Sequence, residues 1–381
     1  MEKIYLDHAA TSPMHPEVIE TMVNHMRDVF GNPSSIHSFG RESRHVLDVA
    51  RQKIASAIHA KPTEIIFTSG GTEADNLAIM GTAFANKHKG KHIITTTVEH
   101  HAVLHTCHFL EKQGFEVTYL PVDVHGRISI KQVEEALTDE TILVTVMFGN
   151  NEVGSIQPIA EIAELLKSHH AVFHSDAVQA FGILPIDVTT IGVDLLSVSA
   201  HKINGPKGVG FLYQREGIKL IPHLYGGEQE RKRRAGTENV AGVVGLSQAV
   251  VLTQADLEKR QQLYRKLQHT FLTVLDKNEI EYHVNSTASD SLPHILNISF
   301  TGTNVEAMLV NLDLAGVAVS SGSACTAGSI DPSHVLVAMF GKESERIQSS
   351  IRFSFGLGNT VEQVEHAARE TATIVKRIVK L

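Results

Sequence analysis

Short runs of β-branched residues alternate with amphipathic stretches along most of the chain, and this alternation restricts the fold more than any other feature. The run EIIFTSG at residues 64–70 predicts a strand that enters a glycine turn, and residues 72–88 predict the helix that follows. Repeats of this kind favour an α/β fold, with a mostly parallel sheet and helices on both faces. Further strands are predicted at residues 92–97, 115–122, 141–148, 171–176, 193–200 and 209–213, and further helices at residues 101–114, 129–137 and 159–169.

The pattern changes near residue 240. Residues 240–277 predict one long helix, and the tail after it has the mixed pattern of a small α+β domain. We therefore expect a large domain of residues 16–255 and a small domain built from residues 1–15 and 256–381. In the tail, strands are predicted at residues 293–300, 317–322 and 349–356, and helices at residues 305–316 and 361–379.

Composition sets broad limits on the class of protein. A length of 381 residues is sufficient for a large domain with a second, smaller one. The formal net charge of −8 argues against general nucleic-acid binding. Two cysteines cannot form a disulfide framework, and we see neither a leader peptide nor an apolar run long enough to cross a membrane. These features predict a soluble protein of a reducing compartment, with a cytoplasmic location.

The stretch SVSAHKINGPKGVGFL places Lys202 directly after a predicted buried strand. Ligands of open α/β sheets bind beyond the carboxyl ends of the strands, so this lysine is expected in a cleft. Removal of water from an ammonium group lowers its pKa and frees the amine as a nucleophile, as a Schiff-base lysine requires. A solvated loop lysine is the ordinary alternative, and this stretch alone does not exclude it. The glycines have the wrong order for a nucleotide-binding P-loop.

Three other strand ends carry groups that a pyridoxal phosphate (PLP) site needs. Gly71 and Thr72 stand at the start of a predicted helix, where backbone N–H groups favour a phosphate, although an ordinary helix cap fits equally well. Asp176 ends an apolar strand, and a carboxylate there can keep a pyridine nitrogen protonated. His100 follows another strand, where an imidazole can stack on a flat ring and move protons.

With these residues in place, the sequence resembles the cysteine desulfurases of the NifS/IscS type, which belong to the class V aminotransferases and have the PLP-dependent transferase fold type I. The resemblance covers essentially the whole chain, and its motifs follow the order of the family. It implies a large domain with a mostly parallel sheet and a small α+β domain that carries the catalytic cysteine loop. The motifs are YLDHAAT, GNPSSIH, FTSGGTEADN, VEHHAVL, NNEVGSIQPI, HSDAVQAFG, SAHKINGPKG, RAGTENV, SSGSACTAGS and SIRFSFG.

The resemblance implies a role for each site residue. Lys202 is the lysine that binds PLP covalently and removes the α-proton of the substrate. Asp176 pairs with the ring nitrogen, and His100 stacks on the ring and takes part in proton transfer. Asn151 and Arg352 hold the substrate amino acid, and the planar guanidinium of Arg352 suits a carboxylate. Thr237 is expected to reach the phosphate of a neighbouring subunit, which implies a homodimer. The remaining PLP contacts implied by the resemblance are Asn151, Gln179 at the ring oxygen, and Gly71, Thr72, Ser199 and His201 at the phosphate.

Cys325 lies in the tract SSGSACTAGS, among serine, glycine and alanine residues. By resemblance, its thiolate takes sulfur from L-cysteine, leaving L-alanine and a persulfide on Cys325. Small neighbours permit the backbone motion that carries a persulfide to an acceptor protein. The spelling SSGSAC resembles the group with the longer catalytic loop, whose sulfur goes to iron–sulfur cluster scaffolds or tRNA-thiolating enzymes; the sequence leaves the choice between them open.

Other features favour plainer interpretations. Cys107 falls on an apolar helix and is expected to be a buried hydrophobic residue. His101, His105 and His108 share one helical face, yet no companion carboxylate is in register, so we expect no physiological metal site. The basic run at residues 231–234 predicts either a solvated face or a surface for an acidic partner or tRNA, and no stable nucleic-acid complex is expected.

Two other functions fit parts of the sequence. An aminotransferase or a selenocysteine lyase would share Lys202 but would not need the Cys325 thiol to act on L-cysteine. A catalytically silent sulfur carrier would keep Cys325 without PLP, and the full set of PLP residues argues against it. A purified protein without colour would favour the carrier.

Overall fold

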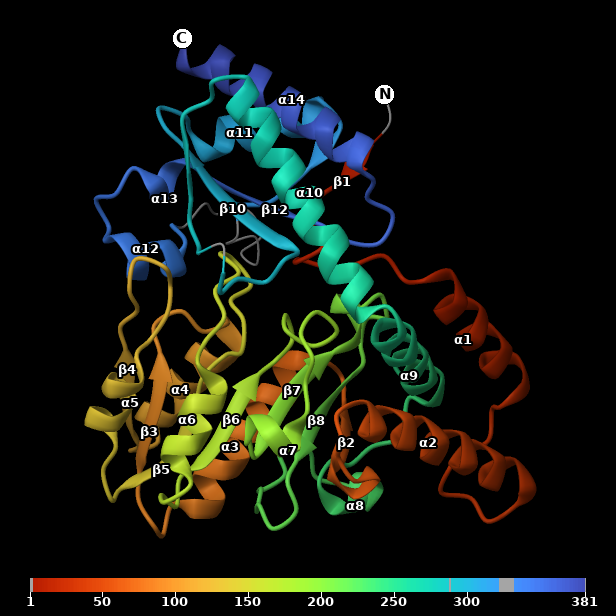
Figure 1. The fold of residues 1–381 in the computed structure, drawn as a ribbon. Coiled ribbons are helices and arrows are strands. Elements are labelled where there is room, and N and C mark those ends of the chain that lie inside the picture. Colours follow the sequence, from red (N-terminus) through yellow and green to blue (C-terminus); the bar gives the residue numbers. More distant parts are fainter. Residues whose placement is uncertain (1–2, 288, 322–331, 381) are drawn as a thin grey trace.

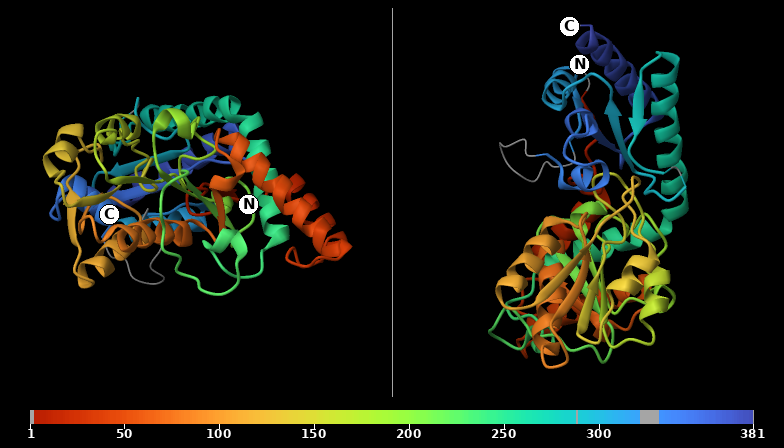
Figure 2. Two further views of the ribbon diagram at one scale, coloured as in Figure 1. Left: turned by 90° about the horizontal axis from the view of Figure 1, so that it is seen from below. Right: turned by 90° about the vertical axis from the view of Figure 1, so that its left-hand side faces the viewer.

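The computed structural model describes residues 3–287, 289–321 and 332–380 (Figure 1). A larger body contains the central sheet, and a smaller body that holds the C-terminus lies beyond the carboxyl ends of its parallel strands (Figures 1 and 2). This arrangement confirms the predicted α/β fold with a large, mostly parallel sheet and a smaller α+β part. The predicted domain limits, residues 16–255 against residues 1–15 and 256–381, stay an interpretation.

The central sheet has seven strands in the order β2-β8-β7-β6-β5-β3-β4. Only β8 runs antiparallel to its neighbours β2 and β7. The other pairs are parallel, so the carboxyl ends of β3, β5, β6 and β7 meet at one edge. The strands are β2 (Ile65–Thr68), β3 (His92–Thr96), β4 (Glu116–Leu120), β5 (Thr141–Thr145), β6 (Val172–Asp176), β7 (Leu195–Ser199) and β8 (Gly210–Gln214).

In most strands of the central sheet, adjacent residues enter different cores, as the period of two in a strand predicts. Ile66, Leu143 and Leu195 pack with the apolar faces of α3 (Gly71–Asn86) and α4 (His101–Lys112). Their neighbours Ile65 and Leu196 belong to the larger core on the other face. That face is covered by α5 (Ile130–Ala136), α6 (Ile159–Leu166) and α7 (Val188–Ile191). Ser129 and Gln132 form the capping box that the sequence predicts at the start of α5.

Three further helices pack beside the sheet near β2. Helix α9 (Val240–Ala255) contacts both α1 (Pro16–Asp28) and α2 (Ser38–Ala57). Short turns complete this part: η1 (Pro62–Glu64), η2 (Ala200–Lys202) and α8 (Gln229–Lys232).

The smaller body is built on an antiparallel sheet in the order β12-β10-β9. Phe271 of α10 packs against Phe353 of β12 with ring centroids 4.4 Å apart, so α10 covers one face of this sheet. A parallel pair, β1 with β11, ties the N-terminal residues to the same body. Its strands are β1 (Ile4–Tyr5), β9 (Tyr282–Val284), β10 (Ile295–Phe300), β11 (Val317–Ala318) and β12 (Ser350–Ser354), and its helices are α10 (Leu257–Lys277), α11 (Val305–Leu314), α12 (His334–Phe340), α13 (Arg346–Ser349) and α14 (Val361–Val379).

The prediction of one long helix over residues 240–277 is wrong. The chain forms α9 and α10, which break at Asp256 and meet at 73°. The two halves pack on different partners: α9 lies against α1 and α2, whereas α10 lies against α14. A straight helix could not satisfy both surfaces, so the chain turns where an aspartate, a residue that favours helix ends, interrupts the apolar run.

Within the described residues, no single helix has both the length and the apolar composition needed to span a membrane. The bent pair α9 and α10 passes that test only when the two helices are taken together.

Candidate active site

Predicted site residues lie at or just after the carboxyl ends of four strands of the central sheet. The turn after β2 leads to Gly71 at the start of α3, and the segment after β3 ends at His100, the N-cap of α4. Asp176 is the last residue of β6, and Ser199 is the last residue of β7. Parallel strands bring these ends to one edge of the sheet, which is where ligands of open α/β sheets bind.

A cavity of about 330 Å³ lies at this edge. Its walls combine residues from the central sheet with Arg352 of β12, so the cavity lies between the two bodies of the fold. Ten predicted site residues line it: Gly71, Thr72, His100, Asn151, Asp176, Gln179, Ser199, His201, Lys202 and Arg352.

Lys202 lies in the turn η2 directly after β7. Its Nζ donates hydrogen bonds to the carbonyl oxygens of Ala9 and Ala10 at 2.5 and 2.8 Å. The N-terminal segment thus holds the amine at the cavity wall, although residues 9 and 202 are far apart in the sequence.

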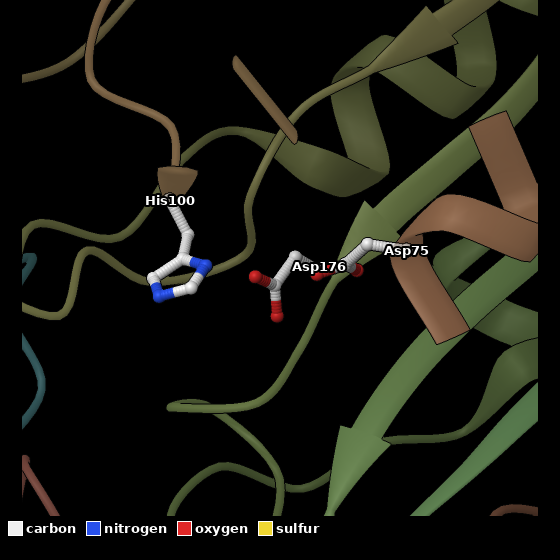
Figure 3. Close-up of side chains that lie close together, drawn as sticks. All are labelled: Asp75, His100 and Asp176. Carbon is white, nitrogen blue, oxygen red and sulfur yellow. The ribbon is translucent and has the colours of Figure 1, made fainter. Parts of the chain in front are cut away.

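Asp176 and His100 face each other across the cavity (Figure 3). Burial raises the pKa of the Asp176 carboxyl, while the Val178 N–H and the charge of Lys202 oppose that shift. Burial, and then the charge of Lys202, lowers the pKa of His100 to about 4, so its ring is neutral at pH 7. Because His100 Nδ1 accepts the Ala102 N–H at 3.1 Å, the proton of this neutral ring is on Nε2.

Arg352 is deeply buried, with its side chain 3 % exposed. Its guanidinium donates to the Asp7 carboxylate and to the carbonyl oxygen of Asn151, each at 2.8 Å. Within the described residues, its Nε has no hydrogen-bond partner. A fixed, buried cation with one unused donor beside a cavity is suited to a carboxylate ligand.

One predicted site residue does not line this cavity, and another lies outside the described residues. Thr237 is exposed and does not line it. Cys325 falls in residues 322–331, outside the described residues.

Comparisons with known proteins identify the family. The model of the family described as Aminotransferase class-V matches residues 4–366. An IscS-group relative from Bacillus subtilis (strain 168) is 64% identical over 99% of this chain and 100% of its own length. The cysteine desulfurase IscS of Methanosarcina thermophila is 49% identical over 98% of this chain and 92% of its own. The chain belongs to the cysteine desulfurases of the class-V aminotransferase family.

Solved structures agree with this assignment. A NifS-like protein superposes with a TM-score of 0.92 at 35% identity, covering 98% of this chain and 100% of its own. The structure named SspA in complex with cysteine gives a TM-score of 0.81 at 38% identity, with 92% of this chain and 98% of its own covered.

Enzymes of this desulfurase family use PLP, and the cavity fits that cofactor. A Cβ at Gly71 would lie 2.7 Å from Cγ2 of Val178, so only glycine brings the backbone this close at the start of α3. The first N–H groups of a helix have no intrahelical acceptor, and the Ser199 hydroxyl lies beside them. One end of the cavity is therefore suited to a phosphate and the other, at Asp176, to a ring nitrogen.

Four residues of this desulfurase site were not assigned from the sequence. Asp7 binds Arg352, and the carbonyl oxygens of Ala9 and Ala10 hold Lys202. Asp7, Ala9 and Ala10 lie in the motif YLDHAAT. The sequence therefore contained the motif but did not show which residues it contacts. Asp75, in the motif FTSGGTEADN, also lines the cavity.

His101, His105 and His108 share one face of α4, as predicted, and the ring centroid of His105 lies 6.5 Å from that of His108. His101 lies 5.0 Å from His105 and 4.8 Å from His334 of α12, measured between ring centroids, whereas His108 packs on Tyr119. Within the part of the chain that the structure describes, the one group with spacing suited to a metal is Asp75, His100 and Asp176 (Figure 3). That group lies in the cavity assigned above to the cofactor.

The basic run is largely occupied by contacts within the chain. Arg234 donates two hydrogen bonds to Glu73 of α3, at 2.8 and 3.2 Å. Arg233 donates to Gln214, and Lys232 pairs with Glu228 at 2.9 Å. Because Arg234 braces the first turn of α3, its replacement would disturb the cavity as well as any acceptor surface.

His174 provides a pH-dependent test of the core behind the site. Burial lowers its pKa to about 3, so the folded state keeps it neutral while the unfolded state takes up a proton below about pH 6.5. Its stabilisation relative to a His174→Gln variant is therefore complete above pH 6.5 and is lost as the pH falls toward 3. We expect the difference in unfolding free energy between the two proteins to shrink by about 1 kcal/mol per pH unit. Urea unfolding at pH 7.5, 6.0 and 5.0 measures it; a constant difference would contradict a neutral His174.

Proposed function

We propose that the protein removes sulfur from L-cysteine with PLP as cofactor, giving L-alanine and a persulfide on Cys325 that passes to an acceptor protein. The observation that carries this proposal is the grouping of Lys202, Asp176 and Arg352 around one cavity. The names of the relatives support the reaction, and the SspA structure with cysteine supports the substrate.

When bound, PLP supplies an aldehyde for the substrate amine and a ring that accepts electrons. Lys202 Nζ is the amine that would hold it, and Asp176 would face the ring nitrogen. Gly71, Thr72, Ser199 and His201 would hold the phosphate. Gln179 would approach the ring oxygen; its amide nitrogen donates to the Ala9 carbonyl oxygen at 2.9 Å, and its oxygen pairs with His294.

The substrate would be held by its carboxylate. Arg352 is fixed by Asp7 and by the carbonyl of Asn151, so its position costs little further ordering when the substrate binds. Lys202 Nζ is placed to take the proton from the substrate α-carbon. His100, neutral and protonated on Nε2, is placed to donate a proton on the other side of the cavity.

The sulfur step needs no external oxidant. The Cys325 thiolate forms an S–S bond with the substrate sulfur as the substrate Cβ–S bond breaks. The electron pair that remains on the substrate side is taken up with a proton, and L-alanine is released. The product is a persulfide on Cys325, which is the form of sulfur that an acceptor thiolate can attack.

A homodimer is part of the proposal. Helix α1, the segment after it and the start of α2 expose apolar side chains that one chain leaves uncovered: Ile19, Val23, Met26, Phe30, Ile36 and Phe39. A patch of this kind is typical of a protein interface. Thr237, exposed and outside its own cavity, is then available to the phosphate site of the partner subunit.

The acceptor is proposed as a class. The IscS relatives and the SSGSAC spelling favour an iron–sulfur cluster scaffold or a tRNA-thiolating enzyme. The solved structures named SspA and DndA have the same fold, so the fold by itself does not identify the acceptor. A cytoplasmic location, in which thiols stay reduced, suits persulfide transfer.

The reaction can be tested directly. Incubation of the PLP-loaded protein with L-cysteine, without reductant, should add one sulfur atom to the peptide that contains Cys325 and release an equal amount of L-alanine. Mass spectrometry and alanine analysis measure the two products. Pyruvate in place of alanine, or alanine without sulfur on any cysteine, would contradict the proposal.

A further inference from the structure

At the wall of the cavity, a second carboxyl group faces Asp176. Asp75 lies one turn into α3 and is 1 % exposed, and Asp176 is 5 % exposed. Their carboxylate oxygens and a ring nitrogen of His100 all lie within 4.8 Å of one another (Figure 3). Two buried carboxylates this close repel strongly, so one of them retains a proton.

The surroundings of the two groups differ. Asp176 accepts the Val178 N–H at 2.9 Å and lies in the field of Lys202, and both favour its anion. Asp75 has no cation beside it, and within the described residues its Oδ1 has no hydrogen-bond partner. Burial, and then the charge of Asp176, raises the pKa of Asp75, and a hydrogen bond from the Ser197 hydroxyl opposes this shift without reversing it.

The other groups that face Asp75 do not supply a positive charge. His174 Nε2 of β6 lies 3.6 Å from Asp75 Oδ1, but His174 is buried and neutral. That ring is held at both nitrogens, by Thr145 at 2.8 Å and by Ser197 at 2.9 Å. Glu99, before α4, adds a further acidic group that disfavours the Asp75 anion, and His100 is neutral as well.

We propose that Asp75 is a positioning residue that carries the single proton of the Asp75–Asp176 pair and thereby fixes the negative charge on Asp176. The sequence signal for it is the aspartate four residues after Gly71, which one helical turn brings back to the sheet edge. Its effect on the cofactor rests on the proposed function, because it acts through Asp176. The location of the proton does not rest on the proposed function, and it can be measured in the protein without cofactor.

Infrared spectroscopy of the cofactor-free full chain provides the test, because a protonated carboxyl group has a C=O band that a carboxylate lacks. At pH 7.5, the spectrum of wild type minus Asp75→Asn should contain one such band. In the Asp176→Asn variant, removal of the neighbouring charge should move the titration of that band to lower pH. A Glu99→Gln variant is the matched control: it removes a different buried carboxyl group and should leave the Asp75 band in place.

Cofactor binding separates this role from a structural one. Asparagine mimics a protonated aspartate, so Asp75→Asn should bind PLP within about threefold of wild type, whereas Asp176→Asn should bind at least about tenfold more weakly. The absence of a protonated-carboxyl band assigned to Asp75 would overturn the proposal. A band that titrates at the same pH in wild type and in the Asp176→Asn variant would overturn it as well. Neither result would contradict the proposed desulfurase reaction. If a variant fails to fold, the pH titration of the carboxyl C=O band in the wild-type protein still tests the proposal.

Discussion

Lys202→Ala is expected to lower the rate of L-alanine formation from L-cysteine by at least about a thousandfold, because one amine both holds the cofactor and moves the α-proton. The Ala9 and Ala10 carbonyl oxygens place that amine at the cavity wall, and no other lysine lines the cavity in the described residues. Alanine production measures the loss, and the visible absorption of the purified protein reports whether cofactor is retained.

Lys219→Ala is the matched control for this change. Lys219 is exposed on the segment after β8 and does not line the cavity, so its replacement should leave activity unchanged. Borohydride reduction of the loaded wild-type protein should fix the cofactor to the peptide that contains Lys202. A label on another lysine, or full activity in Lys202→Ala, would remove the basis of the proposed reaction.

Cys325→Ala is expected to reduce sulfide release from L-cysteine by at least about a hundredfold while cofactor binding is retained. The thiolate of Cys325 is the proposed nucleophile toward the substrate sulfur, and alanine has no atom that can take this role. Sulfide release in the presence of a reductant measures the loss, and an unchanged visible spectrum shows that the PLP site is intact. Sulfide release at the wild-type rate would exclude the persulfide route.

The second cysteine supplies the control. Cys107 is fully buried on α4, and burial raises the pKa of its thiol, so it offers neither access nor a thiolate. Cys107→Ala should therefore keep its activity, at a small cost in stability for the sulfur it removes from the core. The pair of variants separates a reacting thiol from a packed one in the same chain.

Much of the fold follows from local sequence patterns. The helix at Val361–Val379 has the predicted bounds, and the strands from β2 to β8 lie within a few residues of their predicted ranges. The long helix at residues 240–277 was the failure. The periodicity of apolar residues indicates that a segment is helical. It does not indicate that α9 and α10 pack on different helices, so the turn at Asp256 was not predicted.

The candidate site divides in the same way. Lys202, Asp176 and His100 could be named because each follows a strand, and the carboxyl ends of parallel strands meet. The contacts of Asp7, Ala9 and Ala10 could not be named, because they join residues more than 190 positions apart. The partnership of Asp75 with Asp176 was hidden because it also joins residues that are distant in the sequence, 101 positions apart.

The order of strands and helices, the family and the identity of the reactive groups were therefore written in the sequence by itself, since each depends on neighbouring residues or on a short motif. Only the tertiary structure decided which backbone oxygens hold Lys202, which acid fixes Arg352 and which carboxyl group faces Asp176. Charges and hydrogen bonds act over a few ångströms of space, and the folded chain alone sets those distances.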